Sequence, residues 1–442
     1  MFRLLQRSVL FLAGFSLPVQ GFSFTEGAFG FTISKAVIAV LFVFGMLHFF
    51  VLGSRPAKDR KHLWILAFAI SWTLSAAVAF LDGAPLAAVT INTTQRFSLL
   101  LFYVLIGLVI RTPTDVSLLL WGLLMGGALT AAPAALGLQQ GSGALGYGER
   151  FTGLAGQENV LGFDMTVCLA AGVALLFTTR SHLRRGLLVA FMALCVSGLF
   201  LSLSRAALVA AIAMVLFWLY RSRQIENLKY VILAGLVLAV VVLMTPESVF
   251  ARLETVFDRS ARQGDASIQS RFFQFSLALK AFFSSPLWGV GGENFVAWSA
   301  RQPDGFSNPW SVHNAYLAVA AEQGLLGLVP YLAILLLTWI DFTRCRRIAR
   351  AHSRQDDLEL RNLGHYAFFM QIALLGMLVM ALTGQAHRSK TMWMVLGLSA
   401  PLLALCRSRS GQFSAVVSRP LESMEAASTS PLAGSGQPAG IR

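Results

Sequence analysis

Residues 41–70 read LFVFGMLHFFVLGSRPAKDRKHLWILAFAI, which is two apolar runs separated by a short basic loop. The same alternation recurs along all 442 residues of the chain, which is 56% hydrophobic and only 13% charged. Soluble domains carry about a quarter charged residues, and a run of about 20 apolar residues crosses a bilayer as a helix. The sequence therefore predicts an all-α polytopic membrane protein.

Twelve hydrophobic segments are predicted. The first resembles a signal peptide because two arginines precede a short apolar core, but the VQGFS that follows is a poor cleavage site, so we count the segment as a span. The predicted segments are 4–18, 31–52, 62–81, 97–110, 116–138, 160–178, 186–203, 205–220, 229–245, 314–340, 363–383 and 391–406.

The segments divide the chain into four parts. Residues 1–245 hold nine transmembrane helices, residues 246–313 form one long loop, and residues 314–406 hold the last three helices. Residues 407–442, rich in Ser, Gly, Pro and Ala, are predicted to be a disordered tail. A loop as long as 246–313 is uncommon without a function.

The long loop contains a predicted amphipathic helix. In DASIQSRFFQFSLALKAFFSSP (265–286), apolar residues recur at helical spacing and form one stripe: Ile268, Phe272, Phe275, Leu279, Phe282 and Phe283. Asp265 or Ser267 is expected to cap this helix, and Pro286 to end it. Such a helix is expected to lie in the membrane interface or to cover the mouth of the bundle.

Lys and Arg concentrate in four loops that fall on one side of the membrane if the segments alternate. Basic loops stay in the cytoplasm, so both termini are predicted to be cytoplasmic and the long loop to face outward. The formal charge of +14 is then a property of these loops, and no nucleic-acid partner is predicted. The loops are SRPAKDRKH (54–62), TRSHLRRG (179–186), YRSRQ (220–224) and TRCRRIARAHSRQ (343–355).

A histidine opens the span that follows the long loop, in NPWSVHNAYLAVAAEQGLLG (308–327). An imidazole at the membrane–water boundary titrates near neutrality, so His313 is a candidate proton acceptor. The alternative is that His313 and Asn314 bond the free backbone groups of a helix N-terminus. Glu322 is expected about 13 Å deeper, where we interpret it as a partner for another helix or as part of a polar cavity wall.

Arginines are predicted to surround this histidine. Arg205, in LFLSLSRAALVA (199–210), follows a tight turn at a helix N-terminus, which favours an anion; an arginine reaching for the interface is the alternative. Arg271 lies in the loop helix, and the simpler interpretation is that it is a solvated charge on a surface helix. A ring of guanidinium groups suits a diphosphate. The other cations predicted on this side are Arg150, Arg388 and Lys390.

The sequence lacks the motifs of nucleotide binding and metal binding. No GxxxxGK[ST] is present, and WGVGGENF (288–295) lacks the GxGxxG spacing. The predicted outer loops contain no DxD pair, so neither a metal nor a cofactor is expected. The four cysteines show no metal-ligand spacing and none lies in the long loop, so no disulfide is expected there. A transfer reaction at this face would need an already activated donor, with arginines in place of a metal.

Three stretches resemble, in this order, the core of the O-antigen ligase and O-antigen polymerase family: SLSRAAL (202–208), SRFFQFSLALKAFFSSPLWGVGGENF (270–295) and HNAYLAVAAEQGLLGL (313–328). The resemblance implies a multi-pass glycosyltransferase of the bacterial inner membrane, with its site at the periplasmic face. Ligases of this family move a glycan from undecaprenyl diphosphate to a sugar of the lipid A core. They do so without a metal and with inversion at the anomeric carbon.

The resemblance also implies roles for individual residues. The essential histidine of the family maps onto His313, and its arginines onto Arg205 and Arg271, which would hold the diphosphate. Further candidates for contact with the substrates are Arg150, Asn159, Asn314 and Arg388. The implied partners are the lipid-linked donor, the lipid A core and membrane lipids.

Three alternatives remain open. One is a protein-glycosylating relative, although such relatives often carry a larger C-terminal periplasmic part. A polymerase of the same family would share the donor and differ in its acceptor, although HNAYL after one large loop favours the ligase. A solute transporter would show inverted repeats and polar sites at the membrane midplane, whereas the polar residues here gather at one face.

Overall fold

The computed structural model describes residues 2–19, 32–51, 53, 59–136, 151–222, 266–302, 311–352 and 357–428, and their regular structure is helical. Ten of the described helices are long and apolar enough to cross a membrane, which confirms the predicted polytopic all-α class. They are α2 (Ile33–Met46) continued by the π-helical turn η1 (Leu47–Val51), α3 (Lys61–Leu81), α4 (Leu86–Val109), α5 (Pro113–Ala135), α6 (Glu158–Thr178), α7 (His182–Leu201), α8 (Arg205–Ser222), α14 (Ala315–Ala351), α15 (Leu358–Ala381) and α16 (Lys390–Ser428).

The remaining two predicted segments have different outcomes. Segment 229–245 lies outside the described residues. Segment 4–18 forms α1 (Phe2–Ser16), which is too short to be counted among those ten helices but buries Leu10 and Ala13 inside the bundle. The structure thus makes α1 part of the helical core, as the sequence analysis expected of a retained segment.

Glycines bring α1 and α5 into backbone contact. A Cβ at Gly122 would overlap the carbonyl oxygen of Phe11, and one at Gly126 would overlap that of Phe15. Small residues four positions apart let two membrane helices approach closely and gain van der Waals contact. This contact fixes α1 against the bundle.

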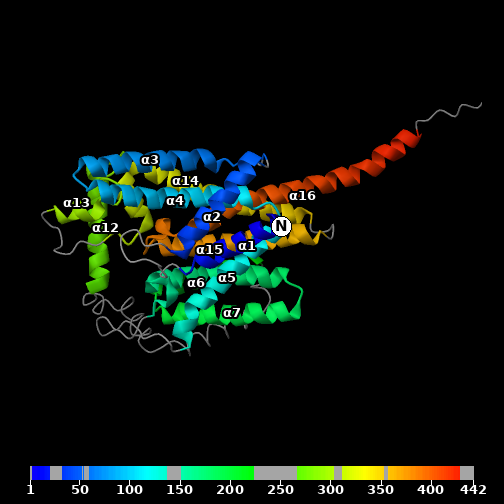
Figure 1. Ribbon diagram of the computed structural model, residues 1–442, viewed down its shortest axis with the longest axis horizontal. Coiled ribbons are helices and arrows are strands. Elements are labelled where there is room, and N and C mark those ends of the chain that lie inside the picture. The colour runs from blue at the N-terminus through cyan, green and yellow to red at the C-terminus, as the bar shows by residue number, and fades with distance from the viewer. Residues whose placement is uncertain are drawn as a thin grey trace, which may run out of the picture.

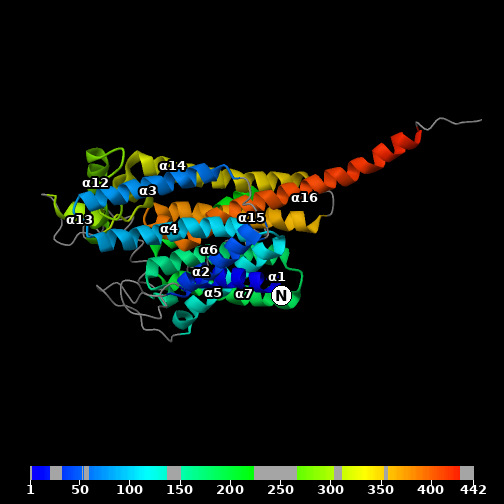
Figure 2. The ribbon, with the colours of Figure 1, turned by 45° about the horizontal axis from the view of Figure 1, so that its top comes forward.

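The basic loops gather at one end of the bundle. Arg60, Arg344 and Arg407 line a single pocket there, and Phe177, near the end of α6, lies 5.3 Å from the ring of His365 in α15. The N-terminus of α1 and the protruding half of α16 lie at this same end in both views (Figures 1 and 2). This grouping is the one that the alternation of segments predicts, and we refer to it as the basic end.

The opposite end carries the short helices of the long loop. Both α12 (Ala266–Ser284) and α13 (Phe295–Ala300) lie there, with α12 running across the direction of the bundle (Figures 1 and 2). The predicted loop helix is confirmed, although Ser267 lies inside it and Asp265 is outside the described residues. Ala278 and Ala281 face the bundle, whereas Phe272 and Phe283 of the predicted stripe are about 70% exposed. Phe272, Leu279 and Phe283 of the stripe therefore face outward, whereas Phe275 packs against the buried cluster that contains Ala278 and Ala281.

Three helices extend beyond their predicted bounds. Helix α4 starts at Leu86 rather than 97, because the polar sequence TINTTQR (90–96) continues the helix. Helix α14 reaches Ala351 through a strongly basic stretch. Helix α16 continues to Ser428, so most of the described part of the tail expected to be disordered is helical, in keeping with its Ala, Leu, Met and Glu content.

The described cysteines all lie within the helical bundle. Cys345 of α14 and Cys406 of α16 are paired, and Cys168 and Cys195 are buried free thiols. The pair joins two helices near the basic end, away from the long loop.

We expect Gly126→Leu to destabilise the protein by about 3 kcal/mol, because its side chain has to force α1 and α5 apart. Unfolding of the purified protein in detergent micelles measures the change. Gly107→Leu is the matched control, since a Cβ at this glycine of α4 meets nothing within 4 Å. Equal stability of the two variants would show that the α1–α5 contact is not tight.

Candidate active site

His313 lies at the end of the bundle opposite the basic loops, directly before α14, and is half-buried. The helix cap is provided by its neighbour: the side-chain oxygen of Asn314 accepts hydrogen bonds from the N–H groups of Tyr316 and Leu317, both at 3.0 Å. The backbone role considered for both residues therefore falls to Asn314. The imidazole of His313 does not cap the helix. Contact of Asn314 with a substrate stays a prediction.

The surroundings of His313 keep its ring neutral. Burial lowers the pKa of His313 below its ordinary value, and the positive charges of Arg271 and Arg388 lower it further. A neutral imidazole has a free nitrogen lone pair at neutral pH and can accept a proton. The structure thus brings two predicted arginines, from α12 and from the 3₁₀ turn η5 (Ala386–Arg388), within electrostatic reach of the histidine.

Arg205 and Asn159 lie at the same end but on neighbouring helices. Arg205 is the first residue of α8, half-buried after a turn in which Leu203 has a φ of 48°. Asn159 is exposed in the first turn of α6, which packs against α8. Arg150 lies outside the described residues. Contact of these three residues with a substrate stays a prediction.

A cluster of four charged side chains, which sequence analysis did not predict as a unit, lies beside His313. Both Arg96 of α4 and Arg388 of η5 form ion pairs with Glu293, one to each carboxylate oxygen. Arg388 also lies 3.7 Å from an oxygen of Glu322. We call Arg96, Glu293, Glu322 and Arg388 the charge cluster. It adds two carboxylates to the predicted ring of arginines and commits Arg388 to protein partners.

The charge cluster is held by a break in α14. Gly324 has a φ of 61° and a ψ of −157°, so α14 is interrupted just after Glu322. The loop after α12 fills the gap: the N–H of Val290 donates to Ala321 O at 2.9 Å, and the N–H of Leu325 donates to Pro286 O at 2.8 Å. The segment that the sequence predicted as one span is thus two helices. The loop after α12 supplies hydrogen-bond partners for the backbone groups that the break leaves free.

Glycines of the WGVGGENF motif make this fit possible. A Cβ at Gly289 would overlap the backbone of Glu322, and one at Gly291 would approach the backbone of Ala79 to 2.7 Å. Both glycines have positive φ, and Glu293 two residues later also has a φ of 58°, which is uncommon for a side chain of this size. The glycines of the motif therefore allow close backbone packing, which places the carboxylate of Glu293 between Arg96 and Arg388.

Two further residues adjoin the charge cluster. The guanidinium of Arg96 lies 5.2 Å from the centre of the Trp72 ring, a cation–π arrangement. His387 is 3% exposed, and neither of its ring nitrogens has a hydrogen-bond partner among the described residues. Burial, followed by the charges of Arg96 and Arg388, holds the pKa of His387 well below its ordinary value. His387 is thus a buried, neutral side chain next to the charge cluster.

Sequence analysis missed these residues for identifiable reasons. Arg96 closes a polar run that hydropathy placed before the span, and only the extended α4 brings it inward. Glu293 had a usable signal, because it is the only acidic residue between 270 and 295. Pairing it with Arg96, almost 200 positions away, required the three-dimensional structure.

The fold is that of a multi-pass helical membrane protein, with His313 and the charge cluster at one end of the bundle. The sequence model of the family described as O-antigen ligase matches residues 190–332, about a third of the chain, so this region is similar to that family. The matched region holds Arg205, Arg271, Glu293 and His313. The family indicates glycosyl transfer of the ligase or polymerase type, with glycan and lipid-linked substrates. No curated protein matches the chain.

We expect Glu293→Gln to destabilise the protein by about 3 kcal/mol, because it leaves two partly buried guanidinium groups without their shared carboxylate. Detergent-phase unfolding of the purified variant measures this. The matched control is Glu359→Gln, which breaks the exposed Glu359–Arg409 pair and should cost less than about 1 kcal/mol.

A second variant separates charge from shape. Removing one positive charge together with the carboxylate, in Arg96→Gln/Glu293→Gln, should recover part of the loss, since the two residues are coupled. If the double variant is as unstable as the sum of the single ones, the charge cluster is not an electrostatic unit.

Proposed function

We propose that this protein is a lipopolysaccharide O-antigen ligase that transfers the O-antigen glycan from undecaprenyl diphosphate to a sugar hydroxyl of the lipid A core. The reaction takes place at the periplasmic face of the inner membrane. The observation that carries the proposal is His313, a half-buried imidazole kept neutral by burial and by the charges of Arg271 and Arg388. The family match supports the same class of reaction.

His313 acts as the general base. Its neutral ring accepts the proton of the acceptor hydroxyl while that oxygen attacks the anomeric carbon of the glycan. The new bond forms on the face opposite the diphosphate, and the bond from the anomeric carbon to the phosphate oxygen breaks. The product has inverted configuration, and undecaprenyl diphosphate leaves with the bonding electron pair.

Arg205 and Arg271 hold the diphosphate and stabilise the charge that develops on it. Guanidinium groups bind phosphate oxygens in a bidentate manner and stabilise a leaving phosphate without a metal. Arg388 has a different role, because its ion pairs with Glu293 and Glu322 are already made inside the protein. It fixes the electrostatic surroundings of His313 and positions η5.

The lipid part of each substrate requires an entry from the bilayer. Phe272 and Phe283 on α12, together with Leu287 and Trp288 after it, expose apolar side chains at the end of the bundle that holds His313. Exposed apolar groups rich in aromatic residues are typical of helices immersed in the membrane interface. We infer that α12 borders the opening through which lipid tails reach the site.

A polymerase of the same family is the second candidate function, because it would use the same donor and differ only in the acceptor. The two are separated by the product: glycan joined to the lipid A core indicates a ligase, whereas longer lipid-linked glycan indicates a polymerase. A transporter would form no glycosidic bond.

The decisive test is a reconstituted assay with purified lipid-linked donor and lipid A core. His313→Ala should lower the turnover rate by about 10²–10⁴-fold with little effect on donor binding, because only proton transfer is lost. His352→Ala, at a half-buried histidine of the basic end, is the matched control and should keep full activity. Unchanged turnover of His313→Ala would remove the proposed base. The assay is run in EDTA, and loss of product on chelation would contradict the metal-free mechanism.

The pH dependence gives an independent test. The base works only when unprotonated, so activity falls as the pH drops through the pKa of His313, which lies below 6.5. Arg271→Gln removes a positive charge near the ring, so the pKa of His313 should rise and the acid limb of the kcat/KM profile should move to higher pH. Arg409→Gln, at the basic end, should leave the limb in place. An unmoved limb in Arg271→Gln would mean that another group titrates.

A further inference from the structure

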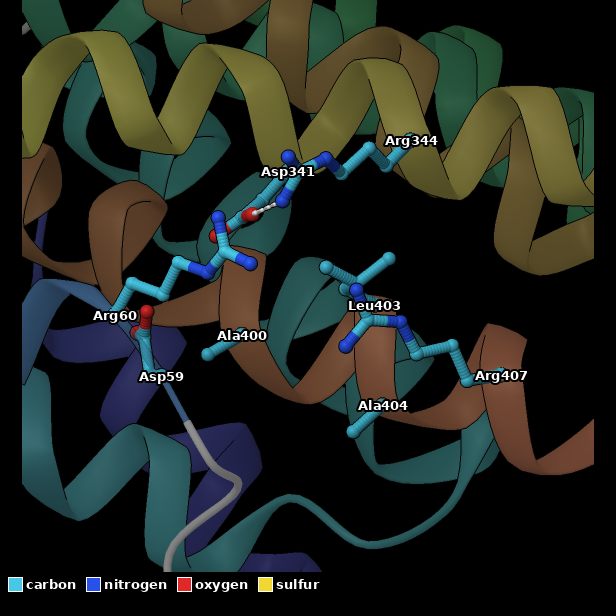
Figure 3. Close-up of a pocket in the computed structure, with 8 residues that line it drawn as sticks. All are labelled: Asp59, Arg60, Asp341, Arg344, Ala400, Leu403, Ala404 and Arg407. Carbon is cyan, nitrogen blue, oxygen red and sulfur yellow. Dashed lines mark ion pairs between the residues drawn. The ribbon is translucent and has the colours of Figure 1, made fainter.

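A second polar pocket lies at the basic end, far along the helices from His313. It has a volume of about 360 Å³, which is in the range of small-ligand sites. Three arginines from separate parts of the chain reach into it: Arg60 before α3, Arg344 on α14 and Arg407 on α16, and their guanidinium groups point toward its centre (Figure 3). The glycosyl transfer proposed above uses none of these residues.

The acidic residues of this pocket are already occupied by protein partners. Lys61 is fully buried and pairs with Asp341 and, at 3.2 Å, with Asp59. Asp59 also accepts a hydrogen bond of 2.7 Å from the hydroxyl of Tyr103. Arg344 lies 4.0 Å from Asp341. The two carboxylates therefore hold the ends of three helices together.

The cations of the pocket exceed its anions. Arg60, Lys61, Arg344 and Arg407 face only two aspartates, and neither Arg60 nor Arg407 forms an ion pair with any described residue. The arrangement leaves an excess of two positive charges around an open space. Guanidinium groups such as those of Arg60 and Arg407, which have no ion-pair partner among the described residues, favour a phosphate oxygen, which they bind in a bidentate manner.

The remaining wall of the pocket is apolar. Ala400, Leu403 and Ala404 of α16 form it, next to Arg407 of the same helix, so cationic and aliphatic side chains line one cavity (Figure 3). Basic pockets between the ends of transmembrane helices bind the head groups of anionic lipids. A soluble phosphate would use the cations but not the aliphatic side.

We propose that this pocket binds the phosphate group of an anionic phospholipid from the membrane leaflet at the basic end. The phosphodiester lies between Arg60 and Arg407, and the first part of an acyl chain covers Leu403 and Ala404. Bound lipid joins the ends of α3, α14 and α16 at the face opposite the proposed reaction centre. The inference does not depend on the proposed function, because it concerns lipid binding alone.

Native mass spectrometry of the purified full-length protein tests the proposal, with phosphatidylglycerol, phosphatidylcholine and inorganic phosphate as probes. Phosphatidylglycerol should bind and phosphatidylcholine should not. Arg60→Gln/Arg407→Gln should weaken binding at least about tenfold, the equivalent of one charge-assisted hydrogen bond. The control Arg180→Gln/Arg184→Gln removes the same charge from exposed positions at the same end and should bind like the unmodified protein.

A third variant distinguishes a pocket from general surface attraction. Ala404→Phe fills the cavity and leaves every charge in place, so it should also lose phosphatidylglycerol. Unchanged binding by Ala404→Phe or by Arg60→Gln/Arg407→Gln would overturn the proposal. So would equal binding of the two lipids, or displacement of phosphatidylglycerol by an equal concentration of inorganic phosphate.

Discussion

Backbone polar groups inside a membrane protein must find partners within the protein, and the end of this bundle that holds His313 depends on how that requirement is met at Gly324. A helix interrupted at membrane depth leaves N–H and C=O groups that lipid cannot satisfy. Here the loop after α12 enters the break and supplies those partners, at Pro286 and Val290. The long loop is therefore part of the transmembrane structure as well as its cover.

The break also explains how charged groups are tolerated beside the bundle core. Glu322 lies immediately before the break, and Glu293 is carried in by the same loop that fills it. Their carboxylates meet Arg96 and Arg388, which come from two other parts of the chain. Each ion would be costly alone in a poorly solvated position, and mutual pairing offsets much of that cost. Arg388 of the cluster, after burial and Arg271, also lowers the pKa of His313.

Much of the architecture was predictable because hydrophobic length and the distribution of Arg and Lys are strong local signals in membrane proteins. The helix at 266–284 and the position of His313 at the end opposite the basic loops followed from such signals. The charge cluster did not, since no local pattern relates Arg96 to Glu293. Gly324 was also missed, because hydropathy continues unbroken across it and its positive φ arises from tertiary contact with Pro286 and Leu287. Periodicity finds helices, but it does not report where a helix is interrupted by a distant loop.

The glycine-mediated contact between α1 and α5 bears on biosynthesis. Helix α1 is synthesised before its main neighbour, α5, and three further membrane helices lie between them in the chain. The chain is synthesised from the N-terminus at a finite rate. During that interval the carbonyl oxygens of Phe11 and Phe15 lack the close contact that Gly122 and Gly126 of α5 later make with them. Helix α1 can therefore pack against α5 only after Gly122 and Gly126 have been synthesised, so this part of the fold forms late relative to the synthesis of α1.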